Sequence, residues 1–263
     1  MVSLREGLIL EGGGVVSLVG GGGKTSLMFE LARELSMTGD SVLTTTTTKI
    51  LEPSRDQTGG VILSDSVSII LERAAEALSE SPHLTAAVGK LTESGKLYGF
   101  RPELIGELWK AGLFDWIIVE ADGAAGRPLK APAAHEPVIP ACTNRLVGMV
   151  GLNGVGQPLT ERLVFRHEQF ARLTGLSLGS NVTDSSIADV LVCDDGLFKG
   201  FCPEVMRIAF FNQADVGDNF PTGQRIARIL SKRRHSNLNR VVIGQILFDP
   251  PVLEIHDLNY PDF

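Results

Sequence analysis

The sequence predicts an α/β fold with a mostly parallel sheet and helices on both faces. Two observations predict it: short apolar runs alternate with amphipathic segments along nearly the whole chain, and a glycine-rich turn follows an early apolar run. Strands that alternate with helices assemble into parallel sheets, which bind ligands at the carboxyl ends of their strands. Because the 263 residues contain no repeat, charge block or long linker, we expect one domain over 1–263.

The expected elements follow from the apolar runs and their periods. Strands are expected at 15–19, 41–46, 60–63, 84–88, 115–121, 145–150, 206–211 and 240–246. Helices are expected at 24–37, 66–79, 102–112, 159–173, 184–192 and 222–234. The clearest helical stripe consists of Val67, Ile70, Leu71, Ala74, Ala75 and Leu78. A proline-rich stretch interrupts the alternation, so we expect a functional loop at about 124–142 and a helical insertion at about 157–204.

Composition narrows the class of protein and its partners. A hydrophobic content of 43% with 21% charged residues is ordinary for a soluble protein, and no apolar run has the ~18 residues of a membrane span. The net charge of −7 argues against nucleic-acid and anionic-membrane partners. Cys142, Cys193 and Cys202 are far apart and form no C-x-x-C pair, so we expect a reducing cytoplasm. We make no prediction of the oligomeric state.

A run of four glycines has the layout of a phosphate-binding loop. An apolar strand precedes it, and Lys-Thr at the start of a helical stripe follows it. In such a loop backbone N–H groups surround phosphate oxygens at a helix N-terminus, the lysine meets the β and γ phosphates, and the threonine hydroxyl binds magnesium. The sequence therefore predicts a P-loop NTPase-like fold, with a flexible glycine-rich turn as the alternative. The expected nucleotide-binding residues of the loop are Gly20, Gly21, Gly22, Gly23, Lys24, Thr25 and Ser26.

The spacing of this loop departs from the usual Walker A motif. G-x-x-x-x-G-K-[ST] would place its first glycine at Leu18, so the run is better described as G-x-x-G-K-T from Gly20 to Thr25. This shorter form is similar to the loop of Mur-type ligases.

A run of five threonines ends the second expected strand. Threonine favours strands, so the first of them can serve the sheet alone. The later hydroxyls and Lys49 are expected at the carboxyl end of the strand, beside the phosphates. We expect at least one residue from Thr45 to Lys49, with Thr47 and Lys49 as candidates, to bind the nucleotide.

Two acidic residues end the expected strand at 115–121. Glu120 and Asp122 are two positions apart, so on a strand they point the same way. Two neighbouring carboxylates repel each other unless a cation lies between them, and magnesium binds one or two carboxylates together with phosphates. With the expected phosphate loop upstream, we predict that Lys24, Glu120 and Asp122 are catalytic and that Thr25, Glu120 and Asp122 hold Mg²⁺. The alternative is an acidic surface turn.

Asn212-Gln213-Ala214-Asp215 follows another apolar strand and has the form of the guanine-binding N-K-x-D motif of GTPases. An aspartate can accept from guanine N1–H and the N2 amine, a pair that adenine does not offer, and Asn212 would tie this loop to the phosphate loop. Gln213 replaces the usual lysine. We therefore expect GTP to be favoured over ATP, with a helix-capping turn as the alternative.

Two further polar groups have two interpretations each. Arg127, Lys130, His135 and Glu136 lie in the proline-rich loop, and Arg166, His167 and Glu168 lie in the expected helix at 159–173. Either group can face a second substrate or form a solvated surface. A metal site of His135, Glu136 and His167 is not favoured, because nothing in the sequence brings these three residues together.

The segments that combine these features are Val19–Ser26, the threonine run to Lys49, Glu120–Gly123, Ala134–Pro137, Gly196–Gly200 and Asn212–Asp215. Taken in order, they resemble the YqeC family of accessory proteins for selenium-dependent molybdenum hydroxylases. The resemblance implies a P-loop NTPase-like fold and a role in selenium cofactor biosynthesis or in maturation of a client hydroxylase.

Three functions remain open from the sequence. The first is Mg²⁺-dependent hydrolysis of GTP or ATP by a maturation factor. The second is a kinase or ligase that activates a small-molecule second substrate. The third is a scaffold that holds a nucleoside triphosphate without cleaving it.

Overall fold

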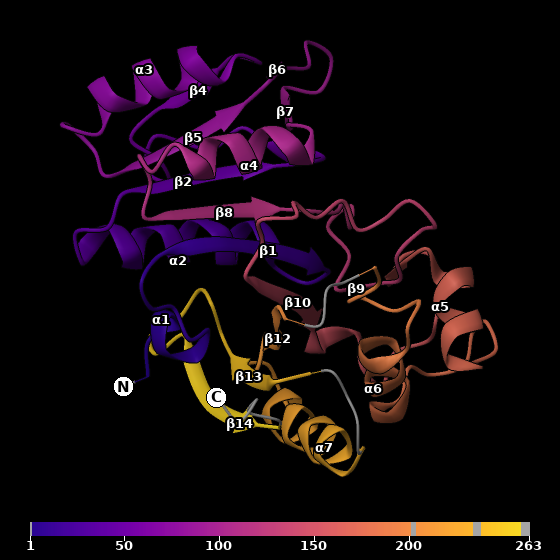
Figure 1. Ribbon diagram of the computed structural model, residues 1–263. Helices are drawn as coiled ribbons and strands as arrows, with labels where there is room; N and C mark the ends of the chain where they lie inside the picture. The colour runs from indigo at the N-terminus through magenta and orange to yellow at the C-terminus, as the bar shows by residue number, and fades with distance from the viewer. Residues whose placement is uncertain (1, 201–203, 234–237, 259–263) are drawn as a thin grey trace.

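The computed structural model describes residues 2–200, 204–233 and 238–258, which fold around a nine-stranded sheet (Figure 1). Its strand order is β14-β13-β12-β10-β1-β8-β2-β5-β4, and its pairs are parallel except for the antiparallel pair of β13 and β14. The strands are β1 (Gly14–Gly20), β2 (Val42–Thr46), β4 (Val61–Leu63), β5 (His83–Ala87), β8 (Trp116–Glu120), β10 (Arg145–Gly151), β12 (Met206–Asn212), β13 (Arg240–Gly244) and β14 (Val252–Asp257). This α/β architecture confirms the expected fold class and is consistent with a P-loop NTPase-like fold.

Helices cover both faces of the sheet, as expected. Val16 and Leu18 of β1 pack in one core cluster with α1 (Leu4–Gly7) and α2 (Lys24–Met37). Val15 and Val19, on the opposite face of the same strand, pack in a second cluster with residues of α5 (His167–Thr174) and of four other helices. These are α3 (Val67–Ala77), α4 (Pro102–Lys110), α6 (Asp184–Val192) and α7 (Asn219–Lys232). Burial of both faces explains why the central strands are almost entirely apolar.

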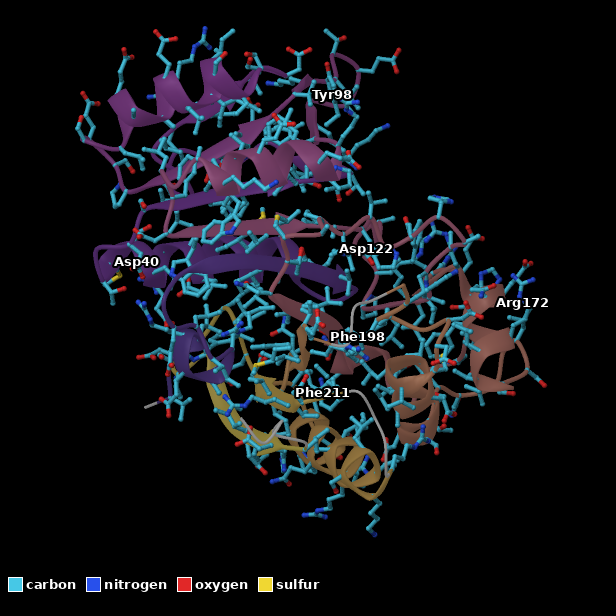
Figure 2. All side chains as sticks on the ribbon, viewed as in Figure 1. Asp40, Tyr98, Asp122, Arg172, Phe198 and Phe211 are labelled. Carbon is cyan, nitrogen blue, oxygen red and sulfur yellow. The ribbon has the colours of Figure 1, made fainter. Side chains whose placement is uncertain are left out.

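The expected insertion at 157–204 contains α5 (His167–Thr174) and α6, and its residues 201–203 lie outside the described part of the chain. The insertion packs on the sheet through Phe198, which shares a core cluster with Phe211 of β12 (Figure 2). A Cβ at Gly148 of β10 would lie 2.7 Å from the Phe198 ring, so this strand position has room only for glycine.

Each expected strand is present, with bounds that shift by at most two residues. The expected helix at 159–173 is wrong in its first half, because α5 begins only at His167. Arg166 has a left-handed backbone (φ 63°), and Val164–Phe165 forms a short strand, β11, that pairs with β9 (Leu129–Lys130). The helix expected at 222–234 begins earlier, at Asn219, and residue 234 lies outside the described residues.

A small second sheet was not expected. It consists of β3 (Lys49–Leu51), β7 (Lys96–Tyr98) and β6 (Gly89–Lys90), in that order. The segments that follow β1, β2 and β8 all begin at the carboxyl edge of the central sheet, where the arrows of β1 and β8 end in Figure 1. A 3₁₀ turn, η1 (Leu152–Gly154), follows β10. Among the described helices, none has both the length and the apolar character to cross a membrane.

Candidate functional site

The glycine-rich turn joins β1 directly to α2. β1 ends at Gly20, and Gly23 (φ 125°) is the N-cap of α2, so the strand–turn–helix layout is as expected. Packing also explains the run of glycines: a Cβ at Gly20 would overlap the carbonyl oxygen of Met149, and one at Gly22 would overlap Gly151 of β10. The backbone of the turn therefore lies in direct contact with the backbone of β10, and larger residues would not fit.

The backbone amides of the turn fall into two groups. Gly20 N donates to Asp122 Oδ2 (2.9 Å), and the next two amides donate to carbonyl oxygens of Met149 (3.0 Å) and Arg127 (3.1 Å). The amides of residues 23–26 have no acceptor among the residues described. They are the free N–H groups at the start of a helix, where the helix dipole favours an anion. The fold thus offers four amides to phosphate oxygens, while those of residues 20–22 hold the loop in place.

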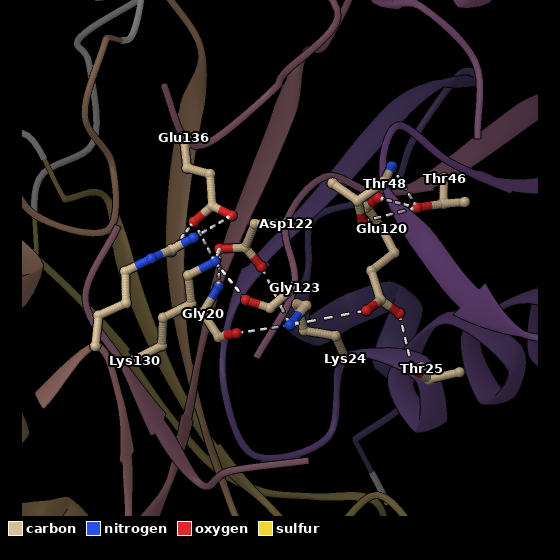
Figure 3. A network of polar contacts seen from close by, with 11 residues as sticks. Gly20, Lys24, Thr25, Thr46, Thr48, Glu120, Asp122, Gly123, Lys130 and Glu136 are labelled. Atoms are coloured by element: carbon tan, nitrogen blue, oxygen red, sulfur yellow. Dashed lines mark hydrogen bonds and ion pairs between the residues drawn. The ribbon is translucent and has the colours of Figure 1, made fainter. Parts of the chain in front are cut away.

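Lys24 lies between the two expected carboxylates (Figure 3). Its Nζ donates to Gly20 O (2.6 Å) and lies 3.1 Å from Asp122 Oδ1 and 3.8 Å from Glu120 Oε1. The Thr25 hydroxyl donates to Glu120 Oε2 (2.7 Å). The structure therefore brings together the four residues that the sequence predicted as catalytic or metal-binding.

Burial and charge act against each other on these groups. Burial lowers the pKa of Lys24, but the carboxylates of Asp122 and Glu120 outweigh it and the net pKa is raised. Burial raises the pKa of Glu120, and the nearby Lys24 ammonium offsets this only in part. Lys24 is therefore a cation at neutral pH, and Glu120 depends on a nearby cation to stay ionised.

The line of charges continues through Lys130. Its side chain is 0% exposed, and Nζ lies 2.9 Å from Asp122 Oδ2 and 2.7 Å from Glu136 Oε2. It also donates to Gly123 O (2.6 Å). Arg166 in turn binds Glu136 through both terminal nitrogens. Burial raises the pKa of Glu136, but hydrogen bonds from Arg166 and Lys130 outweigh it, so the net pKa is lowered.

We call these six residues the charge network: Lys24, Glu120, Asp122, Lys130, Glu136 and Arg166. Cations and carboxylates alternate along it, so each buried charge has an opposite neighbour. The sequence marked Lys130, Glu136 and Arg166 as polar residues of two separate segments. It gave no signal that they would join the site.

The threonine run supports the site mainly through its backbone and hydroxyl groups. Thr47 donates its hydroxyl to Val138 O (2.7 Å) and its amide to Glu120 O (3.1 Å), so it ties the proline-rich loop to β8. Lys49 is exposed on β3. Both residues line the same cavity as Lys24. β8 lies between β1 and β2, so the acidic strand, rather than the threonine strand, is the neighbour of β1 and its glycine-rich turn.

Two cavities meet at the glycine-rich turn. The larger, of about 980 Å³, contains the turn together with Glu120, Glu136 and Arg166, and the smaller, of about 580 Å³, contains Asp215 and Phe248. Residues that line both cavities are Gly22, Gly23, Ser26 and Gly126. A ligand that lies across the turn can therefore reach both cavities.

Asn212 connects the smaller cavity to the turn. Its Nδ2 donates to Gly22 O (2.8 Å) and its Oδ1 accepts from Ile246 N (3.1 Å), which is the link expected from the sequence. Gln213 has a left-handed backbone (φ 69°), and its Oε1 is buried without a hydrogen-bond partner among the described residues. Asp215 is exposed.

The site fits a magnesium ion better than it fits a transition metal. No group of three His, Cys, Asp or Glu side chains with metal-binding geometry occurs among the described residues, so His135, Glu136 and His167 form none. Magnesium needs only one or two carboxylates, with hydroxyl, water and phosphate oxygens completing its shell. Asp122 Oδ1 is buried without a hydrogen bond and faces the Lys24 ammonium at 3.1 Å, so a metal ion would bind this oxygen in place of that ammonium. Cys142 and Cys193 are free thiols, and Cys202 lies outside the described residues.

Comparisons with known proteins identify the family. The family model described as "YqeC protein" matches residues 16–168, a segment that contains the whole charge network but not Asn212 or Asp215. The chain is also 34% identical over 205 residues to "Uncharacterized protein YqeC" of Escherichia coli (strain K12), with 78% of each chain covered. The resemblance inferred from the motifs is thus confirmed, and the chain belongs to the YqeC family.

Proposed function

We propose that this protein binds a magnesium–nucleoside triphosphate at the start of α2 and hydrolyses it. The observation that carries the proposal is the contact of Lys24 and Thr25 with the carboxylates of Glu120 and Asp122, beside four free helix amides. From the family resemblance we further propose that hydrolysis serves the maturation of a selenium-dependent molybdenum hydroxylase.

In this proposal the chain's own groups position the phosphates and balance their charge. The amides of residues 23–26 bind phosphate oxygens, and Lys24 leaves Asp122 and meets the γ phosphate. Thr25 and one or both carboxylates would hold Mg²⁺, which would neutralise the charge that develops on the leaving diphosphate. A water attacks the γ phosphorus, the bond to the bridging oxygen breaks, and orthophosphate and the diphosphate leave. Glu120 and Asp122 remain alternative candidates for orienting the water.

The smaller cavity is the proposed site of the base. It adjoins the turn at Gly22 and Gly23 and contains Asp215, whose carboxylate can accept from guanine N1–H and N2. We therefore propose that GTP is preferred to ATP. Such base-edge pairs discriminate by about 1–3 kcal/mol in nucleic-acid recognition.

The test is a titration of GTP and ATP, with and without magnesium, followed by a phosphate-release assay. Lys24→Ala should abolish turnover. Asp215→Ala should weaken the affinity for GTP about tenfold or more and change the affinity for ATP little. Lys110→Ala, an exposed lysine on α4, and Asp218→Ala, outside the cavity, are the matched controls. No binding of either nucleotide, or unchanged turnover after Lys24→Ala, refutes the proposal; binding without turnover favours the non-hydrolysing scaffold. Equal losses of affinity for GTP and ATP in Asp215→Ala would show that Asp215 does not recognise guanine.

A kinase or ligase is the second candidate, because the larger cavity extends beyond Lys24. It reaches Lys49 and Lys96 on the small sheet and Phe165 beside α5, which leaves space for an acceptor. Nucleotide turnover that rises only with an added small acceptor would favour this function over simple hydrolysis.

A further inference from the structure

The small sheet exposes two lysines on one face. In both β3 and β7 the central residue is buried and its two neighbours are exposed. The antiparallel register pairs Lys49 with Tyr98 and Leu51 with Lys96, so these four side chains share the outer face (Tyr98 marks this sheet in Figure 2). Lys49, Leu51 and Lys96 from this face line the larger cavity.

Within the described ranges of the chain, these two lysines have no carboxylate partner. Neither Lys49 nor Lys96 forms an ion pair with any described residue, whereas Lys90 on the adjacent β6 pairs with Glu52 (2.5 Å). Arg127, on another wall of the cavity, lies over the Phe165 ring (5.4 Å). Arg127 Nε donates to the backbone oxygen of Glu161. Its ion pair with the Glu161 carboxylate is long, at 3.9 Å, and that side chain is 77% exposed, so the solvent screens it and the arginine charge is weakly compensated.

The lining of this cavity is strongly cationic in a protein with a net charge of −7. Its charged residues are Lys24, Lys49, Lys96, Arg127 and Arg166 against Glu120 and Glu136, so five cations face two carboxylates. Glu120 lies beside Lys24, and Glu136 is bound by Arg166 and Lys130. The charges that a carboxylate compensates weakly or not at all are therefore those of Arg127, which has the screened Glu161, and of Lys49 and Lys96. Clustered charge of one sign in a cleft attracts a ligand of the opposite sign.

We infer that the larger cavity binds, beside the nucleotide, a second small molecule that carries at least two carboxylate or phosphate charges. Lys49, Lys96 and Arg127 hold it. Its place next to the γ phosphate rests on the proposed function, but the cationic lining does not. The cavity of about 980 Å³ is at the upper end of the range for small-molecule sites, so it has room for a phosphate tail and a second ligand.

A small molecule fits this site better than an acidic segment of a partner protein. The three cationic residues line one cavity whose walls are the glycine-rich turn, the small sheet and residues 123–127 with Phe165 and Arg166. A bound protein segment would instead need cations spread along a groove.

The test titrates citrate and inorganic phosphate, at constant ionic strength, into protein saturated with magnesium and a non-hydrolysable GTP analogue. Glycerol is the uncharged control, and hexaglutamate represents an acidic protein segment. We expect citrate, phosphate or both to bind at millimolar concentration, and Lys96→Ala to weaken that binding about tenfold, the effect of one charge-assisted hydrogen bond. Lys90→Ala is the matched control, because Lys90 lies on the same sheet outside the cavity.

The outcomes separate the two proposals. Binding of citrate alone assigns a carboxylate ligand, and binding of phosphate alone assigns a phosphate ligand. No anion binding, binding that Lys96→Ala leaves unchanged, or binding of hexaglutamate alone overturns the inference. If the unmodified chain binds no nucleotide, the proposed function fails, and the same titration of the nucleotide-free protein with the Lys96→Ala comparison still decides the anion site.

Discussion

Replacing Lys130 with methionine should destabilise the protein strongly. The side chain is fully buried and its ammonium contacts two carboxylates, Asp122 and Glu136. Breaking a buried ion pair by removing one partner costs about 3–5 kcal/mol, because the other charge stays buried. Lys24 still contacts Asp122 and Arg166 still contacts Glu136, so we expect the lower end, about 3 kcal/mol of unfolding free energy at pH 7.

The unfolding free energy lost in Lys130→Met should become smaller as the pH falls. In the unmodified protein Arg166 and Lys130 outweigh burial and lower the pKa of Glu136, so its stabilisation is present above the unfolded value and is lost as the pH falls through the folded one. In the variant without Lys130, the ionised form of the Glu136 carboxyl is stabilised less in the folded protein. The difference between the two proteins should therefore narrow below the ordinary glutamate pKa of 4.5.

Urea unfolding at pH 7 and in the acid range measures both effects. Lys90→Met is the matched control: its ion pair with Glu52 is exposed and should contribute no more than about 1 kcal/mol. The double variant Lys130→Met/Glu136→Gln should recover part of the loss, because it removes both charges of that pair. Equal losses for Lys130→Met and Lys90→Met, or a difference that does not change with pH, would refute the reasoning.

Two other predictions concern single side chains. Thr25→Val removes the hydroxyl that donates to Glu120, so nucleotide affinity should fall in the presence of magnesium and change little without it, as measured by calorimetry. His83 is buried against Thr44, and burial lowers its pKa to about 4. The unfolded chain protonates this imidazole near pH 6.5, and the folded chain does not. The unfolding free energy measured in urea should therefore fall by about 2 kcal/mol between pH 7 and pH 5. His83→Gln should remove that part of the pH dependence.

The central sheet could be predicted from the sequence because its strands are continuous apolar runs. Both faces of β1 are buried, so its residues are apolar without alternation and the run is easy to find. The strand–turn–helix layout around the glycine run and the acidic end of β8 could be found for a similar reason, because each is a local sequence pattern. Asn212 was placed correctly because its partner, Gly22, belongs to a motif with a known geometry.

The remaining elements depend on contacts that no short segment encodes. β3, β6 and β7 have two or three residues each, too few to show a period. The start of α5 was misplaced because Arg166, the N-cap of the helix, has a left-handed backbone, and its side chain binds Glu136 from another segment. The sequence marked Lys130 only as one of a group that can face a second substrate or solvent, since only the folding of the proline-rich loop brings it to Asp122 and Glu136.

The charge network also limits how a nucleotide can bind. A phosphate that takes the ammonium of Lys24 leaves Glu120 buried with only the Thr25 hydroxyl as a direct partner. Burial already raises the pKa of Glu120, and loss of the nearby cation raises it further. Nucleotide binding without magnesium should therefore take up more protons at Glu120 than binding with magnesium does. Calorimetry in two buffers of different ionisation enthalpy measures this difference, and equal proton uptake under both conditions would show that Glu120 is not where the metal binds.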